Sequence, residues 1–142
     1  MGLVEIKTFE ELMRFMPLIL RVYKDLEGLW EGGTSMADFV QLLTDSFNPP
    51  NSHYYGIRVD DKLFYFVVIT PYEEGIGNVW LFYINKNKRQ YTKAFLETLR
   101  AECKRNGYKQ LIFNSGRMTR SYDRWVTKLG AVKHSITYKL HL

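Results

Sequence analysis

The sequence predicts a single-domain mixed α/β (α+β) fold over residues 1–142, with a central mixed, mostly antiparallel sheet of roughly six to seven strands flanked by about four helices. A length of 142 residues suits one domain, and 46% hydrophobic with 15% aromatic residues is ample for a core. Runs with strand and helix periodicity follow in the order β, α, α, β, β, β, α, β, α, β. One pair of strands has the pattern of an antiparallel hairpin, and one strand–helix–strand unit implies two parallel strands. The sheet should therefore be mixed.

The first elements are a short strand and two helices. Residues 3–7 alternate as a strand, and Thr8 with Glu11 forms a capping box that starts a helix reaching Leu26. Pro17 should kink or split that helix. Ser35 caps a second helix, which the run 48–50 (Asn-Pro-Pro) ends. The intervening linker carries Leu29 and Trp30, which either line a substrate cleft or fold onto the core.

Three strands should follow in the middle of the chain. Residues 53–60 and 62–71 flank a tight turn at Asp60 and Asp61 and are typical of an antiparallel hairpin. The second of these is apolar on both faces, which places it inside a covered sheet. Residues 72–78 then form a turn that leads to a very apolar strand over 78–84.

The last elements complete the predicted sheet. A helix begins near Tyr91 and ends at Gly107, and residues 110–114 form a short apolar strand. Strand, helix and strand in this order imply parallel neighbours. Residues 121–129 form a short fourth helix, and residues 132–142 alternate as one half-buried final strand.

Composition and charge limit the function. The net charge of +5 and pI of about 9.3 allow a nucleic-acid or phosphate-bearing partner without indicating nucleic acid. Cys103 is the one cysteine, so a disulfide framework and a cysteine metal cluster are excluded, which fits a reducing cytoplasmic setting. No segment has the apolar length needed to cross a bilayer, so no membrane association is expected.

The loop between the apolar strand and the third helix is the strongest functional signal. It carries Lys86, Lys88, Arg89 and Lys93 beside a helix start, where unpaired N–H groups and the positive end of the helix dipole attract anions. Such a turn could hold a phosphate. The alternative from these residues alone is an ordinary solvated basic loop.

The order of elements and this loop resemble the GCN5-related N-acetyltransferase (GNAT) superfamily, which has the acyl-CoA N-acyltransferase fold. The family's sequence motif is a strand that ends in an aliphatic residue, followed by a loop of the form [Arg/Gln]-x-x-Gly-x-[Gly/Ala] at the start of the next helix. The resemblance implies that the pyrophosphate of acetyl-CoA (CoA) binds at this loop. Its cofactor-binding residues would then be Ile84, Arg89, Gln90, Tyr91, Thr92, Lys93 and Ala94.

The loop departs from the family pattern at its glycines. Thr92 stands where the central glycine is expected, and Gln90 stands where many members have another. Glycine lets the backbone approach the diphosphate closely, so a threonine should narrow the cradle. The Thr92 hydroxyl could instead donate to a phosphate oxygen.

The resemblance also suggests catalytic residues. In many members a tyrosine protonates the leaving thiolate, and the position of that tyrosine falls on Val126, whose side chain cannot donate a proton. The nearby Tyr122 could offer a hydroxyl instead, or it could simply be a packing residue. A cofactor-contacting asparagine falls near Thr119. Glu73 and Glu74 are the nearest carboxylates for a general base, although two glutamates in a turn are usually only solvated. The three histidines have no metal-ligand spacing, so no metal site is expected.

Three functions follow from these features. The first is an acyl-CoA-dependent N-acyltransferase that moves acetyl from acetyl-CoA to an amine of a small molecule or protein, with a backbone N–H of residues 80–84 polarising the thioester. The second is an inactive binding or structural protein of the same fold, since the chain loosely resembles degenerate acetyltransferase-like proteins of tailed bacteriophages, some of them virion or host-interaction proteins. The third is a nucleic-acid-binding domain, prompted by four cations near the last helix: Arg117, Arg120, Arg124 and Lys128.

Overall fold

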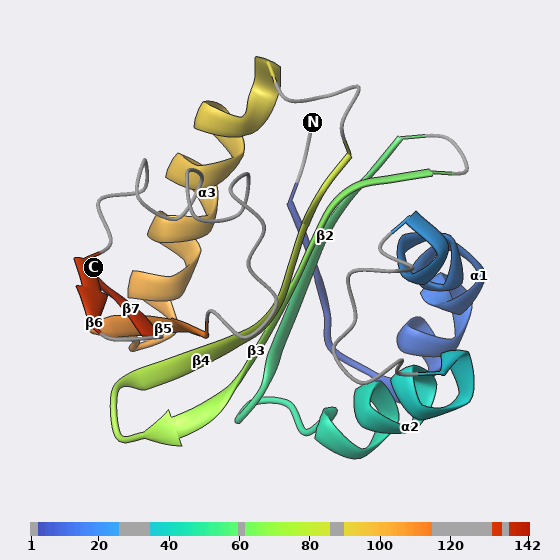
Figure 1. Ribbon diagram of the computed structural model, residues 1–142, viewed down its shortest axis with the longest axis horizontal. Coiled ribbons are helices and arrows are strands. Elements are labelled where there is room, and N and C mark those ends of the chain that lie inside the picture. The colour runs from blue at the N-terminus through green and yellow to red at the C-terminus, as the bar shows by residue number, and fades with distance from the viewer. Residues whose placement is uncertain (1–2, 26–34, 60–61, 86–89, 115–131, 135–136) are drawn as a thin grey trace.

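A computed structural model describes residues 3–25, 35–59, 62–85, 90–114, 132–134 and 137–142. Its described strands form one seven-stranded sheet in the order β1-β2-β3-β4-β5-β7-β6 (Figure 1). The strands are β1 (Val4–Ile6), β2 (His53–Val59), β3 (Lys62–Glu73), β4 (Ile76–Ile84), β5 (Gln110–Asn114), β6 (Val132–His134) and β7 (Thr137–His141). The described helices are α1 (Phe9–Asp25), α2 (Met36–Ser46) and α3 (Thr92–Arg105). The predicted α/β (α+β) architecture is confirmed.

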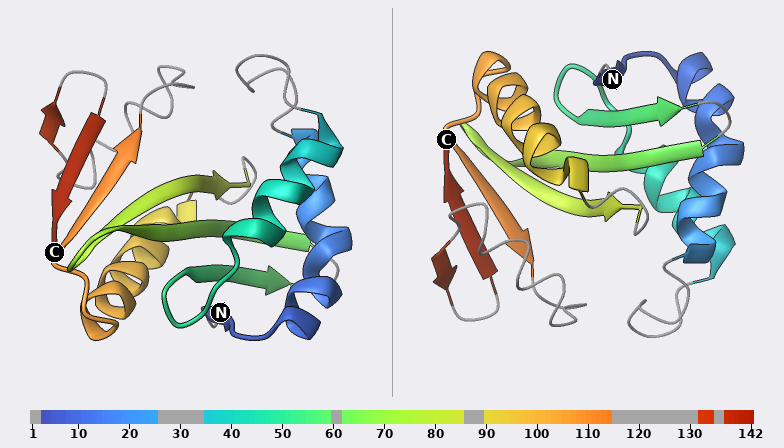
Figure 2. Two further views of the ribbon diagram at one scale, coloured as in Figure 1. Left: turned by 90° about the horizontal axis from the view of Figure 1, so that it is seen from below. Right: turned by 90° about the horizontal axis from the view of Figure 1, so that it is seen from above.

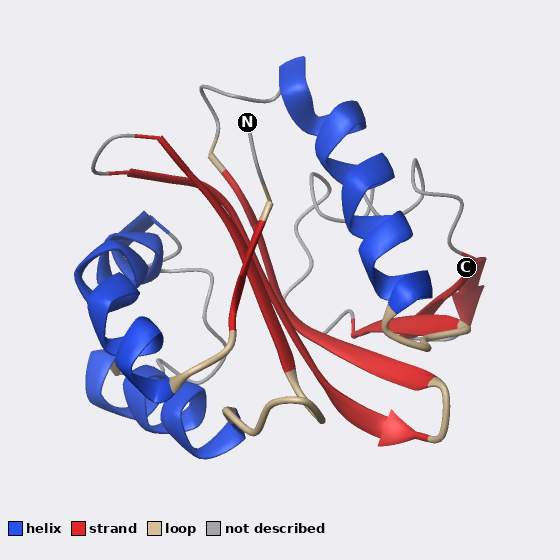
Figure 3. Cartoon of the chain, turned by 180° about the vertical axis from the view of Figure 1, so that it is seen from behind, coloured by secondary structure: helices blue, strands red, loops and turns tan. Residues whose placement is uncertain are grey.

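The helices cover opposite faces of the sheet, with α1 and α2 on one side and α3 on the other (Figure 3). Each face has its own buried cluster. Leu12 and Ile19 of α1, and Phe39 of α2, pack with residues of β2, β3 and β4, whereas Phe95 and Leu99 of α3 pack on the opposite face. The strand β3 supplies both clusters, because five consecutive residues from Tyr65 to Ile69 are fully buried. This confirms that β3 lies inside a covered sheet.

The sheet is mixed as predicted. The strands from β1 to β4 pair antiparallel with their neighbours, β4 pairs parallel with β5, and β5 and β6 both pair antiparallel with β7. The parallel step is the strand–helix–strand unit β4–α3–β5, and α3 supplies the long connection that parallel strands require.

Three details differ from the sequence prediction. The segment 132–142 contains two strands, because β6 and β7 pair antiparallel with His134 opposite Thr137. Pro17 lies inside the continuous helix α1 and does not split it. The strand β3 runs to Glu73, which pairs with Ile76, so the turn before β4 is shorter than residues 72–78. Alternation of apolar residues does not show where a chain reverses, which is why the two C-terminal strands read as one.

Several sequence predictions fall outside the described residues. They are the fourth helix over 121–129, the linker residues Leu29 and Trp30, the turn at Asp60 and Asp61, and the cations Arg117, Arg120, Arg124 and Lys128. Within the described part of the chain, no helix combines the length and apolar character needed to cross a membrane.

Candidate functional site

The N-terminus of α3 differs from the starts of α1 and α2. The Thr8 hydroxyl accepts from the Glu11 N–H at 3.1 Å, and the Ser35 hydroxyl accepts from the Asp38 N–H at 3.1 Å, so both early helices are capped as predicted. Both also carry acidic residues in the first turn. The cap position of α3, Tyr91, makes no side-chain capping bond, and its first turn has no acidic residue. Neither a Tyr91 side-chain cap nor a first-turn carboxylate therefore compensates the positive end of the α3 dipole.

No side chain at position 91 could cap the helix in the present backbone conformation of Tyr91. Its backbone has φ −95° and ψ 1°, whereas the capping Ser35 is extended at φ −74° and ψ 161°. An N-cap side chain reaches the helix N–H groups from the extended conformation. The lack of a side-chain cap at the start of α3 thus follows from backbone geometry as well as from residue type.

The Thr92 side chain points into the protein. Thr92 is 2% exposed, and its buried hydroxyl has no hydrogen-bond partner of good geometry within the described residues. It lies beside the Tyr65 phenol, whose pKa is raised by burial and partly lowered by Thr92. Because the side chain occupies core space beneath the helix, its Cβ does not cover the outer side of the helix start. The expectation that Thr92 narrows the anion cradle stays a prediction.

The strand β4 separates from β5 beside this helix start. The parallel ladder runs from the Ile76–Gln110 pair to the Val79–Phe113 pair and ends there, while β4 continues to Ile84. Figure 2 shows the two strands meeting at one end and diverging toward the other. Among the described residues, the stretch 80–84 consequently has a strand neighbour on the β3 side alone.

A β-bulge lies where the separation begins. In the β3–β4 ladder Val68 pairs with Leu81 and Ile69 with Val79, so Trp80 is an extra residue in β4. A bulge increases local twist and bends the strand that carries it, which turns β4 away from β5. Because β3 and β4 are antiparallel, alternate residues of 80–84 direct N–H and C=O groups away from β3. These groups face the side that β5 has left.

The predicted cofactor-binding residues lie around these two features. Ile84 is half-buried at the end of β4, and Gln90, Tyr91, Lys93 and Ala94 are exposed at the start of α3. With Thr92, which is buried in the first turn of α3, six of the predicted residues lie at one end of β4. Arg89 and Thr119 lie outside the described residues, as do Lys86 and Lys88.

The predicted catalytic carboxylates lie far from that end. Glu73 and Glu74 are exposed where β3 turns into β4, and β4 then extends for nine residues to Ile84. A strand of that length spans roughly 26 Å, which separates these glutamates from the start of α3. The structure does not bring Glu73 or Glu74 together with the loop. Tyr122, the third candidate, lies outside the described residues.

Sequence reasoning missed a polar contact at the end of β4. The Tyr83 hydroxyl donates to Asp25 Oδ2 at 2.6 Å, and Asn85 Nδ2 lies 3.5 Å from the Tyr83 hydroxyl. Burial and the neighbouring carboxylate both raise the Tyr83 pKa, so the phenol keeps its proton. Asp25 is exposed in the last turn of α1, which lies 58 residues from Tyr83 in the sequence. No short-range motif connects two residues so far apart.

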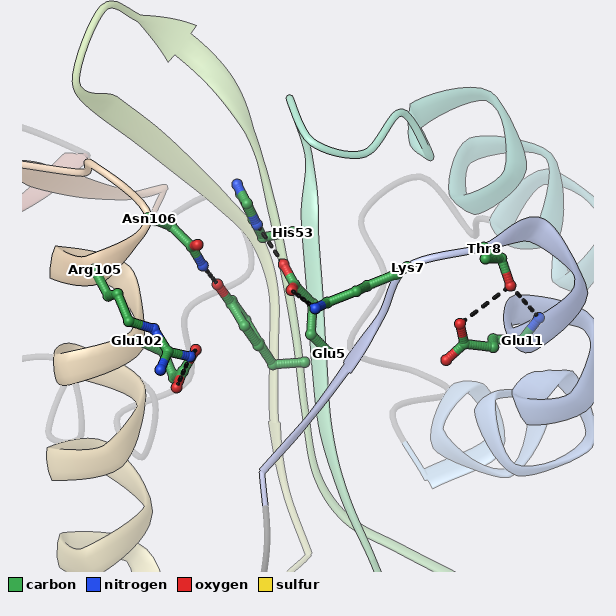
Figure 4. Close-up of polar contacts among 9 residues, drawn as sticks. Glu5, Lys7, Thr8, Glu11, His53, Glu102, Arg105 and Asn106 are labelled. Atoms are coloured by element: carbon green, nitrogen blue, oxygen red, sulfur yellow. Dashed lines mark hydrogen bonds and ion pairs between the residues drawn. The ribbon is translucent and has the colours of Figure 1, made fainter.

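A second missed cluster lies at the opposite end of α3. His53 Nδ1 lies 2.6 Å from Glu5 Oε1 (Figure 4). The imidazole stacks near Tyr55 and meets Tyr108 edge-on. Asn106 donates to the Tyr55 hydroxyl. These contacts join β1, β2 and the segment after α3, so they stabilise the fold away from the open helix start.

The remaining side-chain chemistry is limited. Cys103 is buried, and burial raises the pKa of its thiol to about 12, so it is a poor nucleophile near neutral pH. The part of the chain that the structure describes holds no group of three or more His, Cys, Asp or Glu residues arranged to bind a metal ion.

Solved structures share this fold over the whole chain. A Desulfovibrio desulfuricans protein assigned to the GNAT family of acetyltransferases superposes with a TM-score of 0.74 at 15% identity, covering 99% of each chain. A GNAT-family acetyltransferase from Staphylococcus aureus gives 0.70 at 11% identity over 99% of each chain. The PaiA N-acetyltransferase from Thermoplasma acidophilum, solved in complex with coenzyme A, gives 0.67 at 12% identity over 100% of each chain.

These structures establish the acyl-CoA N-acyltransferase fold for this chain, as the sequence predicted. At such low identity they show the fold alone, and activity needs the separate argument below. No family model matches the sequence, and no curated protein sequence matches it. The resemblance to bacteriophage proteins is not tested by these structures and stays a prediction.

Proposed function

We propose that the protein is an acyl-CoA-dependent N-acyltransferase that transfers an acetyl group from acetyl-CoA to an amine. The fold supports this proposal, since the structures that share it include acetyltransferases and one complex with coenzyme A. The observation that carries it is local to this chain. The start of α3, where Tyr91 makes no capping bond and the first turn has no acidic residue, lies at the same end of β4 as residues 80–84, which extend beyond the β4–β5 ladder.

The start of α3 suits the pyrophosphate of the cofactor. The positive end of the helix dipole favours an anion, and Lys93 adds an exposed cation. In this proposal the exposed residues Gln90, Tyr91 and Ala94 line the cradle. Arg89 and Thr119 stay on the list of cofactor contacts on the strength of the family resemblance.

The part of β4 that diverges from β5 suits the acyl end of acetyl-CoA. A bound thioester supplies the activated acetyl group. An outward N–H among residues 80–84 would hold the thioester carbonyl and stabilise the oxyanion that forms as the amine attacks. The separation of Glu73 and Glu74 from this edge argues against a base role for either. Tyr122 remains the proposed hydroxyl near the leaving thiolate.

The test begins with calorimetry of the whole chain against acetyl-CoA. We expect saturable binding, with S-acetylpantetheine as a control ligand that lacks the pyrophosphate and should bind at least tenfold more weakly. Thiol release is then followed with a panel of amines. Absence of binding at millimolar acetyl-CoA would overturn the proposal. Binding without turnover on any amine would favour the inactive binding protein of the same fold.

A further inference from the structure

We propose that the outer face of α1 binds a second copy of this chain, so that two α1 helices pack antiparallel about a two-fold axis. This inference is independent of the proposed acyl transfer. It starts from the α1 stripe, a line of three exposed apolar residues, Phe9, Met13 and Pro17, that follow one another at intervals of four. Residues four apart lie on the same side of a helix, so the three side chains form one continuous surface.

The α1 stripe differs from the other exposed apolar side chains. Six large hydrophobic residues are exposed in the described part of the chain, and Phe9 and Met13, at 55% and 38%, are the two that share one helix. The opposite side of α1 packs into the core through Leu12 and Ile19, and the stripe belongs to neither core cluster. Scattered apolar residues are normal on a protein surface, whereas a contiguous line of them marks an interaction site.

The charges beside the stripe indicate what binds there. Glu10 and Arg14 follow Phe9 and Met13 by one residue, so they lie together along one flank of the stripe. Arg14 Nη2 lies 2.6 Å from Glu10 Oε1, and both side chains are largely exposed. An exposed pair of this kind adds little stability within one chain. It does give the flank one charge of each sign, one helical turn apart.

This flank is complementary to itself in one orientation. When two copies of a helix pack parallel about a two-fold axis, their equivalent flanks lie on opposite sides of the contact and do not meet. When they pack antiparallel, the flanks lie on the same side and run in opposite directions, so Glu10 faces Arg14 of the partner subunit. The four charges then alternate in sign, and the two helix dipoles oppose each other favourably. Charge complementarity therefore selects a second, antiparallel copy.

The proposed contact is small and lies away from the candidate site. A pair of 17-residue helices is about 25 Å long, so the interface falls at the lower end of specific interfaces and should associate in the micromolar range. Figure 3 shows α1 and α3 on opposite faces of the sheet. Dimerisation should therefore leave the affinity for acetyl-CoA unchanged, and the two proposals can fail separately.

The first test is sedimentation-velocity ultracentrifugation of the whole chain, from micromolar to near-millimolar concentration, where we expect a monomer–dimer equilibrium. Met13→Lys places a charge in the stripe and should raise the dissociation constant of the dimer about tenfold, or about 1.4 kcal/mol. Tyr72→Lys makes the same kind of change at a 60% exposed residue near the end of β3 and should leave the constant unchanged. A wild type that stays monomeric, or equal effects of the two substitutions, would overturn the inference and leave the stripe to another partner.

Charge reversal tests the antiparallel orientation. Glu10→Arg places four cations at the contact and Arg14→Glu four anions, so each should raise the dissociation constant about tenfold. The double variant restores the alternation and should return the constant to within about threefold of the wild type. Thermal unfolding checks that each variant folds. A folded double variant that associates no better than the single variants would overturn the proposed arrangement.

Cross-linking tests the register. Met13 would face Met13 of the partner subunit across the axis, so Met13→Cys should form a disulfide-linked dimer when oxidised with diamide. Tyr72→Cys should stay monomeric, and the native thiol of Cys103 is buried. A mixture of Phe9→Cys and Pro17→Cys should cross-link more than either variant alone, because antiparallel packing places these positions opposite each other. Failure of Met13→Cys to cross-link where the wild type is dimeric would contradict the inference.

Discussion

The two ends of α3 are built differently. At its C-terminal end the backbone groups are used within the protein. Gly107 N–H donates to Lys104 O at 3.1 Å, Tyr108 N–H to Cys103 O at 3.0 Å, and Lys109 N–H to Gly75 O at 2.7 Å. At its N-terminal end Tyr91 makes no side-chain capping bond, and the first turn has no acidic residue. The closed end joins α3 to the β3–β4 turn, whereas at the open end no Tyr91 cap or first-turn carboxylate compensates the positive end of the helix dipole.

Charge follows the same division. Lys104 and Arg105 lie in the last turn, where cations stabilise the negative end of the helix dipole. Lys93 lies in the first turn, where a cation is unfavourable for the isolated helix. The usual rules for capping and charge at helix ends are followed at the C-terminal end of α3 and broken at its N-terminal end. Such a local exception indicates that the N-terminal end has a function. Three predictions test this comparison.

The largest effect is expected at the closed end. A Cβ at Gly77 would lie 2.7 Å from Ile69 Cγ2 and 2.9 Å from Tyr108 Cε1. Gly77→Ala should therefore lower the free energy of unfolding by about 2–3 kcal/mol through overpacking, as measured by urea denaturation. Binding of acetyl-CoA by the folded protein should not change.

Gly107→Ala is the matched control for Gly77→Ala. Gly107 has open space around its Cβ position but a φ of +91°, so the cost should be about 1 kcal/mol and arise from backbone strain. If Gly77→Ala weakened acetyl-CoA binding by a larger free energy than it lowered the free energy of unfolding, the two ends of α3 would not act independently.

An intermediate effect is expected from charge reversal at the open end. Lys93→Glu should weaken acetyl-CoA binding about tenfold, or about 1.4 kcal/mol, while raising the free energy of unfolding by about 0.3–1 kcal/mol through the helix dipole. Lys104→Glu carries the same charge change at the other end of α3 and should leave affinity unchanged while lowering stability. Calorimetry and thermal unfolding measure both. Equal losses of affinity in the two variants would mean that net charge, not the helix start, attracts the cofactor.

The smallest effect concerns the buried hydroxyl of Thr92. Thr92→Val removes a polar group that lacks a well-formed hydrogen bond and keeps the shape, so the free energy of unfolding should rise by about 1 kcal/mol. Because the side chain faces Tyr65, acetyl-CoA affinity should stay within a factor of two of the wild type. A large loss of affinity would show that the hydroxyl turns outward to the phosphate.

The sequence predicted much of the fold because its signals are local. The caps at Thr8 and Ser35, the apolar run ending at Ile84 and the glycine stop at Gly107 each act within a few residues. The cofactor loop was predicted for the same reason, since the strand end and the helix start are separated by only a short segment. The burial of Thr92 was not predicted, because spacing does not tell whether a side chain at a helix start faces the core or the solvent.

By itself, the sequence determined the order of elements, the covered central strand and the placement of a basic turn at a helix start. The tertiary structure decided the bulge at Trp80, the divergence of β4 from β5 and the contact between Asp25 and Tyr83. Periodicity and capping depend on neighbours within one or two turns, whereas these features depend on strand register and on how α1 packs against the sheet. The contact between Asp25 and Tyr83 therefore exists only once its two ends, 58 residues apart, have folded together.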